Sequence, residues 1–84
     1  MKRIHQRTLQ AVFTHPTSAN IAWKDIEALL KGLGGEVSER EGSRIAVVLF
    51  NEIRVFHRPH SSPQTDKGAV ASVRRWLEQH GVNP

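Results

Sequence analysis

The hydrophobic pattern of this 84-residue chain changes its period at a pair of glycines, Gly34-Gly35. Before the glycines, four apolar residues recur at the spacing of one helix face: Ile26, Leu29, Leu30 and Leu33. After the glycines, large apolar residues alternate along short segments, which is the period of a β-strand. The change predicts a helix that ends at the glycines and a group of strands that follows it.

Three segments after the glycines have the composition and length of strands: 36–40, 44–50 and 53–57. Turn residues separate them, Glu41-Gly42 at the first junction and Asn51-Glu52 at the second. Because such short connections join strands that run in opposite directions, the sheet is predicted to be antiparallel.

Helical spacing recurs on both sides of this region, over residues 3–13 and 66–80. Asn20 is a candidate N-cap for the helix before the glycines, and Thr65 for the last helix. Trp23 and Trp76 lie on helix faces and are expected in the core. The sequence therefore predicts one α+β domain over residues 1–84, a two-layer sandwich in the order (α)αβββα, with helices on one face of a three-stranded antiparallel sheet.

Composition excludes several classes of chemistry. The chain has no cysteine, which removes disulfides, cysteine-ligated zinc and thiol nucleophiles. No apolar run approaches the roughly 20 residues of a membrane span, and no apolar segment follows the basic start, so we expect a cytoplasmic protein without membrane contact. No glycine-rich phosphate loop or set of metal ligands appears at a recognisable spacing, so neither cofactor nor metal is predicted.

The formal net charge is +4, and eight of the twelve basic side chains are arginines, which suit a polyanionic partner. One stretch of the chain is rich in basic side chains and holds Asp66 as its only acidic residue: Arg54, His57, Arg58, His60, Lys67, Arg74 and Arg75. We predict that this stretch forms a nucleic-acid-binding surface. The alternative is an ordinary solvated face.

Lys67-Gly68 lies in the first turn of the last predicted helix, where a cation opposes the helix dipole. The placement is explained if an anion binds at this helix N-terminus. The alternative is an ion pair between Lys67 and Asp66 or a nearby glutamate.

The segment His57-Arg58-Pro59-His60 places two histidines three residues apart. Two histidines can serve as general base and general acid near neutral pH, and RNA supplies its own nucleophile, the 2′-hydroxyl. Arg58, or Arg44 from the neighbouring strand, would stabilise the phosphorane. A second interpretation stays open for His57, which alternates with Ile53 and Val55 and would then be a hydrogen-bonded core histidine.

The chain resembles the HicA family of toxin–antitoxin ribonucleases over its last three quarters. Five segments carry the resemblance: Trp23-Lys24-Asp25-Ile26-Glu27-Ala28-Leu29-Leu30, Gly42-Ser43-Arg44, Val55-Phe56-His57-Arg58-Pro59-His60, Lys67-Gly68 and Arg74-Arg75. The resemblance implies a fold like that of double-stranded-RNA-binding domains, cleavage of mRNA, growth arrest and neutralisation by a HicB-type antitoxin. Residues 1–19 would be an N-terminal helical extension.

One residue departs from the family pattern. The family carries a catalytic histidine directly after Gly-Ser on the second strand, whereas Gly42-Ser43 is followed here by Arg44. The resemblance therefore leaves three hypotheses: a metal-independent mRNA ribonuclease that uses His57 or His60, an RNA-binding module that does not cut, and a basic domain that docks an acidic antitoxin. The RNA contacts would come from Arg44, Arg54, Arg58, Lys67, Arg74 and Arg75.

Overall fold

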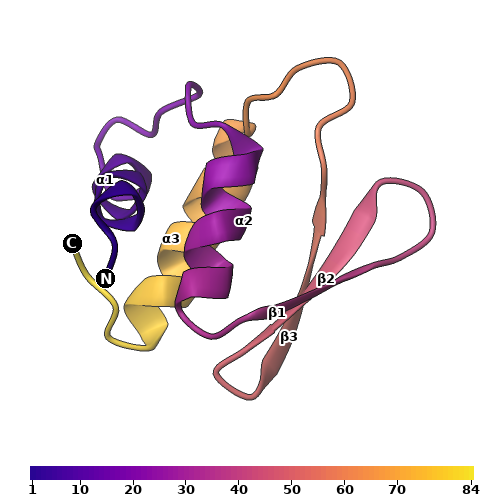
Figure 1. The fold of residues 1–84 in the computed structure, drawn as a ribbon. Coiled ribbons are helices and arrows are strands. Elements are labelled where there is room, and N and C mark those ends of the chain that lie inside the picture. The colour runs from indigo at the N-terminus through magenta and orange to yellow at the C-terminus, as the bar shows by residue number, and fades with distance from the viewer.

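The computed structural model describes all residues, 1–84, as three helices and one three-stranded sheet (Figure 1). The elements are α1 (Arg3–Val12), α2 (Trp23–Gly32), β1 (Glu36–Glu39), β2 (Arg44–Leu49), β3 (Glu52–His57) and α3 (Lys67–Gln79). This order confirms the predicted α+β fold with the arrangement ααβββα. None of the helices has both the length and the apolar character that crossing a membrane requires.

The sheet is antiparallel with the strand order β1-β2-β3, so β2 is central. The predicted turn at Asn51-Glu52 is wrong by one residue, because Leu49 pairs with Glu52 and the turn is Phe50-Asn51. Both turn residues have positive φ, 56° and 60°, as a type I′ hairpin turn requires. The ring of the turn residue Phe50 stacks on His80, with ring centroids 4.1 Å apart.

Both predicted N-caps are also displaced along the chain. α2 has Ala22 as its N-cap instead of Asn20, because residues 21–23 are held extended by hydrogen bonds from Trp23 N to Pro63 O and from Thr65 N to Ile21 O. α3 is capped by Asp66 instead of Thr65. The Asp66 carboxylate accepts a hydrogen bond from the backbone N–H of Ala69, and the Thr65 side chain is buried.

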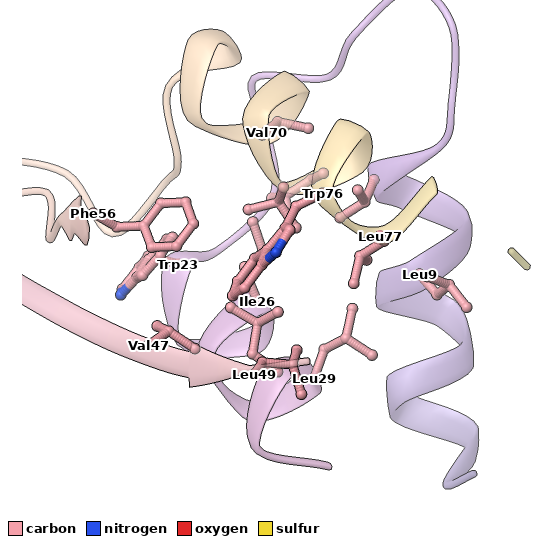
Figure 2. Close-up of a cluster of buried hydrophobic side chains, with 14 of the residues drawn as sticks. Leu9, Trp23, Ile26, Leu29, Val47, Leu49, Phe56, Val70, Trp76 and Leu77 are labelled. Carbon is pink, nitrogen blue, oxygen red and sulfur yellow. The ribbon is translucent and has the colours of Figure 1, made fainter. Parts of the chain in front are cut away.

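The core lies between one face of the sheet and the helices, as Figure 2 shows. β2 and β3 contribute four side chains to it: Ile45, Val47, Leu49 and Phe56. α2 and α3 provide the opposing layer, which includes both tryptophans, as predicted. α1 packs on α2 and α3 on the side away from the sheet, and its Leu9 and Val12 belong to the same core (Figures 1 and 2).

The inner face of β3 is the one that carries Phe56. Its ring lies 5.5 Å from the Trp23 ring and 6.3 Å from the Trp76 ring, measured between centroids. The face with Ile53 and Val55 points to solvent, and these side chains are 60% and 55% exposed. His57 shares that outer face and is exposed, so the interpretation of His57 as a core histidine is wrong.

Candidate functional site

A polar hollow of about 420 Å³ opens beside the end of β3. Both predicted catalytic histidines, His57 and His60, line it. The other lining residues come from the β1–β2 turn, the loop after β3 and the start of α3: Ser43, Arg58, Pro59, Ser61, Ser62, Gln64, Thr65 and Asp66. No large apolar side chain contributes, so the hollow suits a polar or charged ligand better than an apolar one.

The loop that carries His60 is held at both of its ends. At the β3 end, Arg58 N donates to Ser43 O over 2.9 Å. At the other end, Pro63 O accepts from Trp23 N over 2.9 Å, and Thr65 N donates to Ile21 O over 2.8 Å. These bonds tie the loop to the β1–β2 turn and to the start of α2, which fixes the mouth of the hollow.

Arg44 lies beside His57 on the outer face of the sheet, because the two residues are cross-strand partners in the β2–β3 register. Both are exposed. Directly opposed residues bring their Cβ atoms within about 4.5–5.5 Å on the same face. The only side-chain bond of Arg44 is a long one, 3.5 Å from Nε to Glu41 O, so its guanidinium is available to an anion placed at His57.

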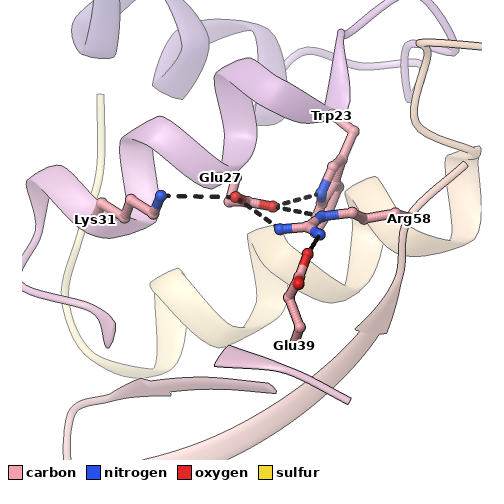
Figure 3. Close-up of polar contacts among 5 residues, drawn as sticks. All are labelled: Trp23, Glu27, Lys31, Glu39 and Arg58. Carbon is pink, nitrogen blue, oxygen red and sulfur yellow. Dashed lines mark hydrogen bonds and ion pairs between the residues drawn. The ribbon is translucent and has the colours of Figure 1, made fainter. Parts of the chain in front are cut away.

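Arg58 turns the other way, toward the helices, and is bound by two carboxylates (Figure 3). Its Nε and Nη2 donate to the two Glu27 oxygens over 3.2 Å each, and its Nη1 donates to Glu39. The hydrogen bonds to Glu27 and then Glu39 raise the pKa of Arg58. Its charge is therefore compensated inside the protein, although the residue also lines the hollow.

Glu27 is the centre of this network. Its Oε1 also accepts from Trp23 Nε1 over 2.9 Å, and Lys31 lies 3.7 Å from its Oε2. Burial raises the pKa of Glu27, but the hydrogen bonds from Arg58 and Trp23 and the nearby positive charges outweigh burial and lower it overall. The network joins α2, β1 and the end of β3. It holds Arg58, one of the residues that line the hollow, in place.

Two more of the predicted RNA-binding arginines have partners within the protein. Arg54 lies over the Trp76 ring, 5.2 Å from its centroid, and donates to Glu52 over 3.3 Å. Arg74 donates to Val12 O over 3.2 Å and to Thr17 Oγ1 over 3.1 Å, which fastens α3 to the end of α1. RNA contacts by Arg54, Arg58 and Arg74 stay predictions, and such contacts would compete with these bonds.

Lys67 and Arg75 are exposed, and neither forms an ion pair within the chain. The predicted alternative for Lys67, an ion pair with Asp66 or a nearby glutamate, is therefore absent. The predicted anion site at the start of α3 meets a difficulty, because the Asp66 carboxylate already caps this helix and would repel an incoming anion.

The acidic partners of Arg58 are residues that the sequence analysis did not find. A signal existed for part of the network, because Trp23, Glu27 and Lys31 follow one another at the i, i+4 spacing of a helix face. No local signal links Glu27 to Arg58, which is 31 residues away.

The comparison with protein families agrees with this architecture. The model described as the HicA toxin of bacterial toxin–antitoxin systems matches residues 23–82, from the first residue of α2 to just beyond α3. No curated protein and no solved structure matches the chain. The matched part contains the sheet, the hollow and the Arg58 network, and lacks α1. Since the match covers well over half of the chain, the protein belongs to the HicA toxin family.

Proposed function

We propose that this toxin binds RNA and cleaves mRNA at the hollow beside β3. The observation that carries the proposal is that His57 and His60 line one polar hollow at the end of the β2–β3 hairpin. The two side chains make no hydrogen bond within the protein, which leaves their ring nitrogens free for substrate. Two histidines that line one hollow can act as general base and general acid near neutral pH.

The reaction we propose is the internal transesterification of RNA. One histidine accepts the proton of a ribose 2′-hydroxyl while that oxygen forms a bond to the adjacent phosphorus. The bond from phosphorus to the 5′-oxygen of the next nucleotide breaks, and the second histidine donates a proton to the leaving oxygen. The products are a 2′,3′-cyclic phosphate and a 5′-hydroxyl, and the sequence of steps needs no metal ion.

Arg44 is the residue we assign to the developing negative charge on the phosphorane. It lies on the same face as His57 and has only one long hydrogen bond of its own. Arg58 is less suited to this role, because Glu27 and Glu39 already neutralise its guanidinium. A cation that is free before the substrate arrives stabilises the transition state more than one that must first leave a carboxylate.

Lys67 and Arg75 are proposed to contact phosphates next to the hollow and along α3. Membership of a toxin–antitoxin family implies an antitoxin partner, and we propose a HicB-type protein in the cytoplasm that covers this same surface. Residues 1–84 would act as one domain, with residues 1–19 as an extension of the family fold.

A second candidate function is RNA binding without cleavage. The observation in its favour is Arg44, which occupies the position where the resemblance places a catalytic histidine. In this case the same surface would hold RNA, and His57 and His60 would serve as hydrogen-bond donors only.

Incubation of the purified protein with a long mRNA in EDTA tests both candidates. The wild type is compared with His57→Ala/His60→Ala and with Arg44→Ala, and each protein is also tested for RNA binding by gel shift. His15→Ala is the matched control, because His15 is exposed in the α1–α2 connection and lies outside the hollow.

The ribonuclease proposal predicts cleavage by the wild type and by His15→Ala. The double histidine variant should lose at least about 100-fold in rate while it still binds RNA. Arg44→Ala should reduce the rate by a similar order. Binding without cleavage by every form would favour the second candidate. Cleavage that survives the double histidine change would contradict the assignment of the histidines.

A further inference from the structure

The positive charge of this protein is distributed unevenly along the chain. The family-matched residues 23–82 hold nine basic and eight acidic side chains, so this part is close to neutral. Residues 1–22 hold three basic side chains and no acidic one: Lys2, Arg3 and Arg7. Three of the four net positive charges therefore lie in residues 1–22, outside the family-matched part, with Arg3 and Arg7 in α1 and Lys2 directly before it.

Arg3 and Arg7 of α1 have no partner within the protein and in this respect resemble the exposed Arg75. α1 buries Thr8, Leu9 and Val12 against the rest of the protein, while Arg3 and Arg7 are exposed. No ion pair or side-chain hydrogen bond of the structure involves either arginine, whereas Arg54, Arg58 and Arg74 each bind groups within the protein.

Arg3 and Arg7 are spaced i, i+4, so they lie one above the other on the same side of the helix. Like charges at this spacing destabilise a helix, and α1 has no acidic residue in its first turn to offset them. A partner that carries a row of negative charges would remove this repulsion.

Lys2 borders a hollow of about 850 Å³ between the start of α1 and the end of α2, together with His5 and Lys31. None of the residues that line this hollow is acidic. Lys31 is paired with Glu27 over 3.7 Å, so Lys2 is the free cation beside this hollow. Arg7 borders a different hollow, next to the start of α2, which Asp25 also lines.

We infer that α1 is a second RNA-contact surface that binds the phosphate backbone through Lys2, Arg3 and Arg7. The inference rests on the proposed RNA-binding function and adds a separate site to it. α1 lies on the side of α2 and α3 away from the sheet (Figure 1), whereas His57 lies on the outer face of the sheet. Because α1 lies apart from the reacting atoms, it raises affinity for RNA without taking part in the chemistry.

The test is the salt dependence of RNA binding by the full chain. Dissociation constants for a long single-stranded RNA are measured from about 50 to 200 mM KCl, for the wild type and for Lys2→Ala/Arg3→Ala/Arg7→Ala. Each lost phosphate contact reduces the slope of log K against log salt by roughly 0.7, so the triple variant should lose about two units of slope. Its affinity at the lowest salt should fall by at least about tenfold.

The charge-retaining variant Lys2→Arg/Arg3→Lys/Arg7→Lys is the matched control and should keep the wild-type slope. All three positions are exposed, so Leu9 and Val12 still anchor α1, which far-UV circular dichroism can check. If the protein cleaves RNA, the triple alanine variant should raise KM and leave kcat unchanged.

Two results would overturn the inference alone. The first is a triple alanine variant that binds RNA with the wild-type salt slope. The second is a wild type that binds anionic phosphatidylserine vesicles, together with a triple alanine variant that loses this vesicle binding and keeps its RNA binding. A wild type that binds no RNA would instead remove the proposed function and this inference together.

Discussion

The two faces of β3 differ in how fully their side chains are used within the protein. On the inner face, Glu52, Arg54 and Phe56 all contact α3, and Arg58 continues this face into the network with α2. On the outer face, Ile53, Val55 and His57 have no partner above them. The charged side chains of the inner face therefore stabilise the fold. His57, which is available to a ligand, lies on the outer face beside the apolar Ile53 and Val55.

The largest expected difference in unfolding free energy is between a substitution on the inner face of β3 and one on its outer face. Phe56→Ala removes a ring that packs between Trp23 and Trp76 and should cost about 3–5 kcal/mol of unfolding free energy. Val55→Ala on the outer face should cost less than about 1 kcal/mol, because the side chain is already mostly exposed. Urea unfolding followed by tryptophan fluorescence measures both, and equal losses would contradict the assignment of the two faces.

A smaller difference in stability is expected between the site of Arg58, which is bound within the protein, and that of Arg44, which is exposed. Glu27→Ala leaves the Trp23 N–H without its acceptor and Arg58 with Glu39 as its only carboxylate partner, and should cost about 2 kcal/mol. Arg44→Ala should change stability by less than about 0.5 kcal/mol, because this exposed guanidinium has one long bond to lose. A comparable loss in Arg44→Ala would mean that Arg44 has a structural role and is not held free for substrate.

The same network should make stability depend on pH. Burial raises the pKa of Glu27, but the bonds from Arg58 and Trp23 lower it overall, so the folded pKa lies below the unfolded value near 4.5. A depressed carboxyl pKa stabilises the folded state above the unfolded pKa, and this stabilisation is lost as pH falls through the folded pKa.

Urea midpoints at pH 7, 5, 4 and 3 check this for the wild type and Glu27→Gln. The stability difference between the two proteins should be constant above about pH 5 and shrink below it. Glu52, whose pKa is also lowered, mainly by the bonds from Trp76 and His80, is present in both proteins and cancels in the difference. A difference that stays constant down to pH 3 would show that Glu27 titrates normally.

The order of elements was predictable because its signals are local. Apolar spacing defines α2 and α3, and the short gaps between alternating segments require hairpins. The inner face of β3 was not predictable in the same way. Which face of β3 points inward depends on Trp23 of α2, before the strands in the sequence, and on Trp76 of α3, after them. These rings pack on Phe56 and Arg54.

The candidate site likewise has a part that local sequence predicts and a part that depends on distant residues. His57 and His60 are three residues apart, so their meeting in one hollow follows from a local pattern. Arg58, in contrast, is bound by Glu27, which is 31 residues away, and Arg74 is bound by the carbonyl of Val12, 62 residues away. A count of basic residues cannot distinguish an arginine that has such a partner from one that does not.

The smallest effect is expected at the turn between the two strands, where a change alters neither face of the sheet. Asn51 has φ of 60° in the second position of the type I′ turn, where glycine is preferred. Asn51→Gly should therefore raise stability by about 0.5 kcal/mol, with RNA binding and cleavage unchanged. Phe50→Gly, at the other turn position, relieves the same backbone cost but loses the stacking on His80 and the edge contact with Trp76, and should destabilise. If Phe50→Gly were the more stable of the two, the Phe50 ring would contribute nothing to the inner layer, and the inner face would end at Glu52.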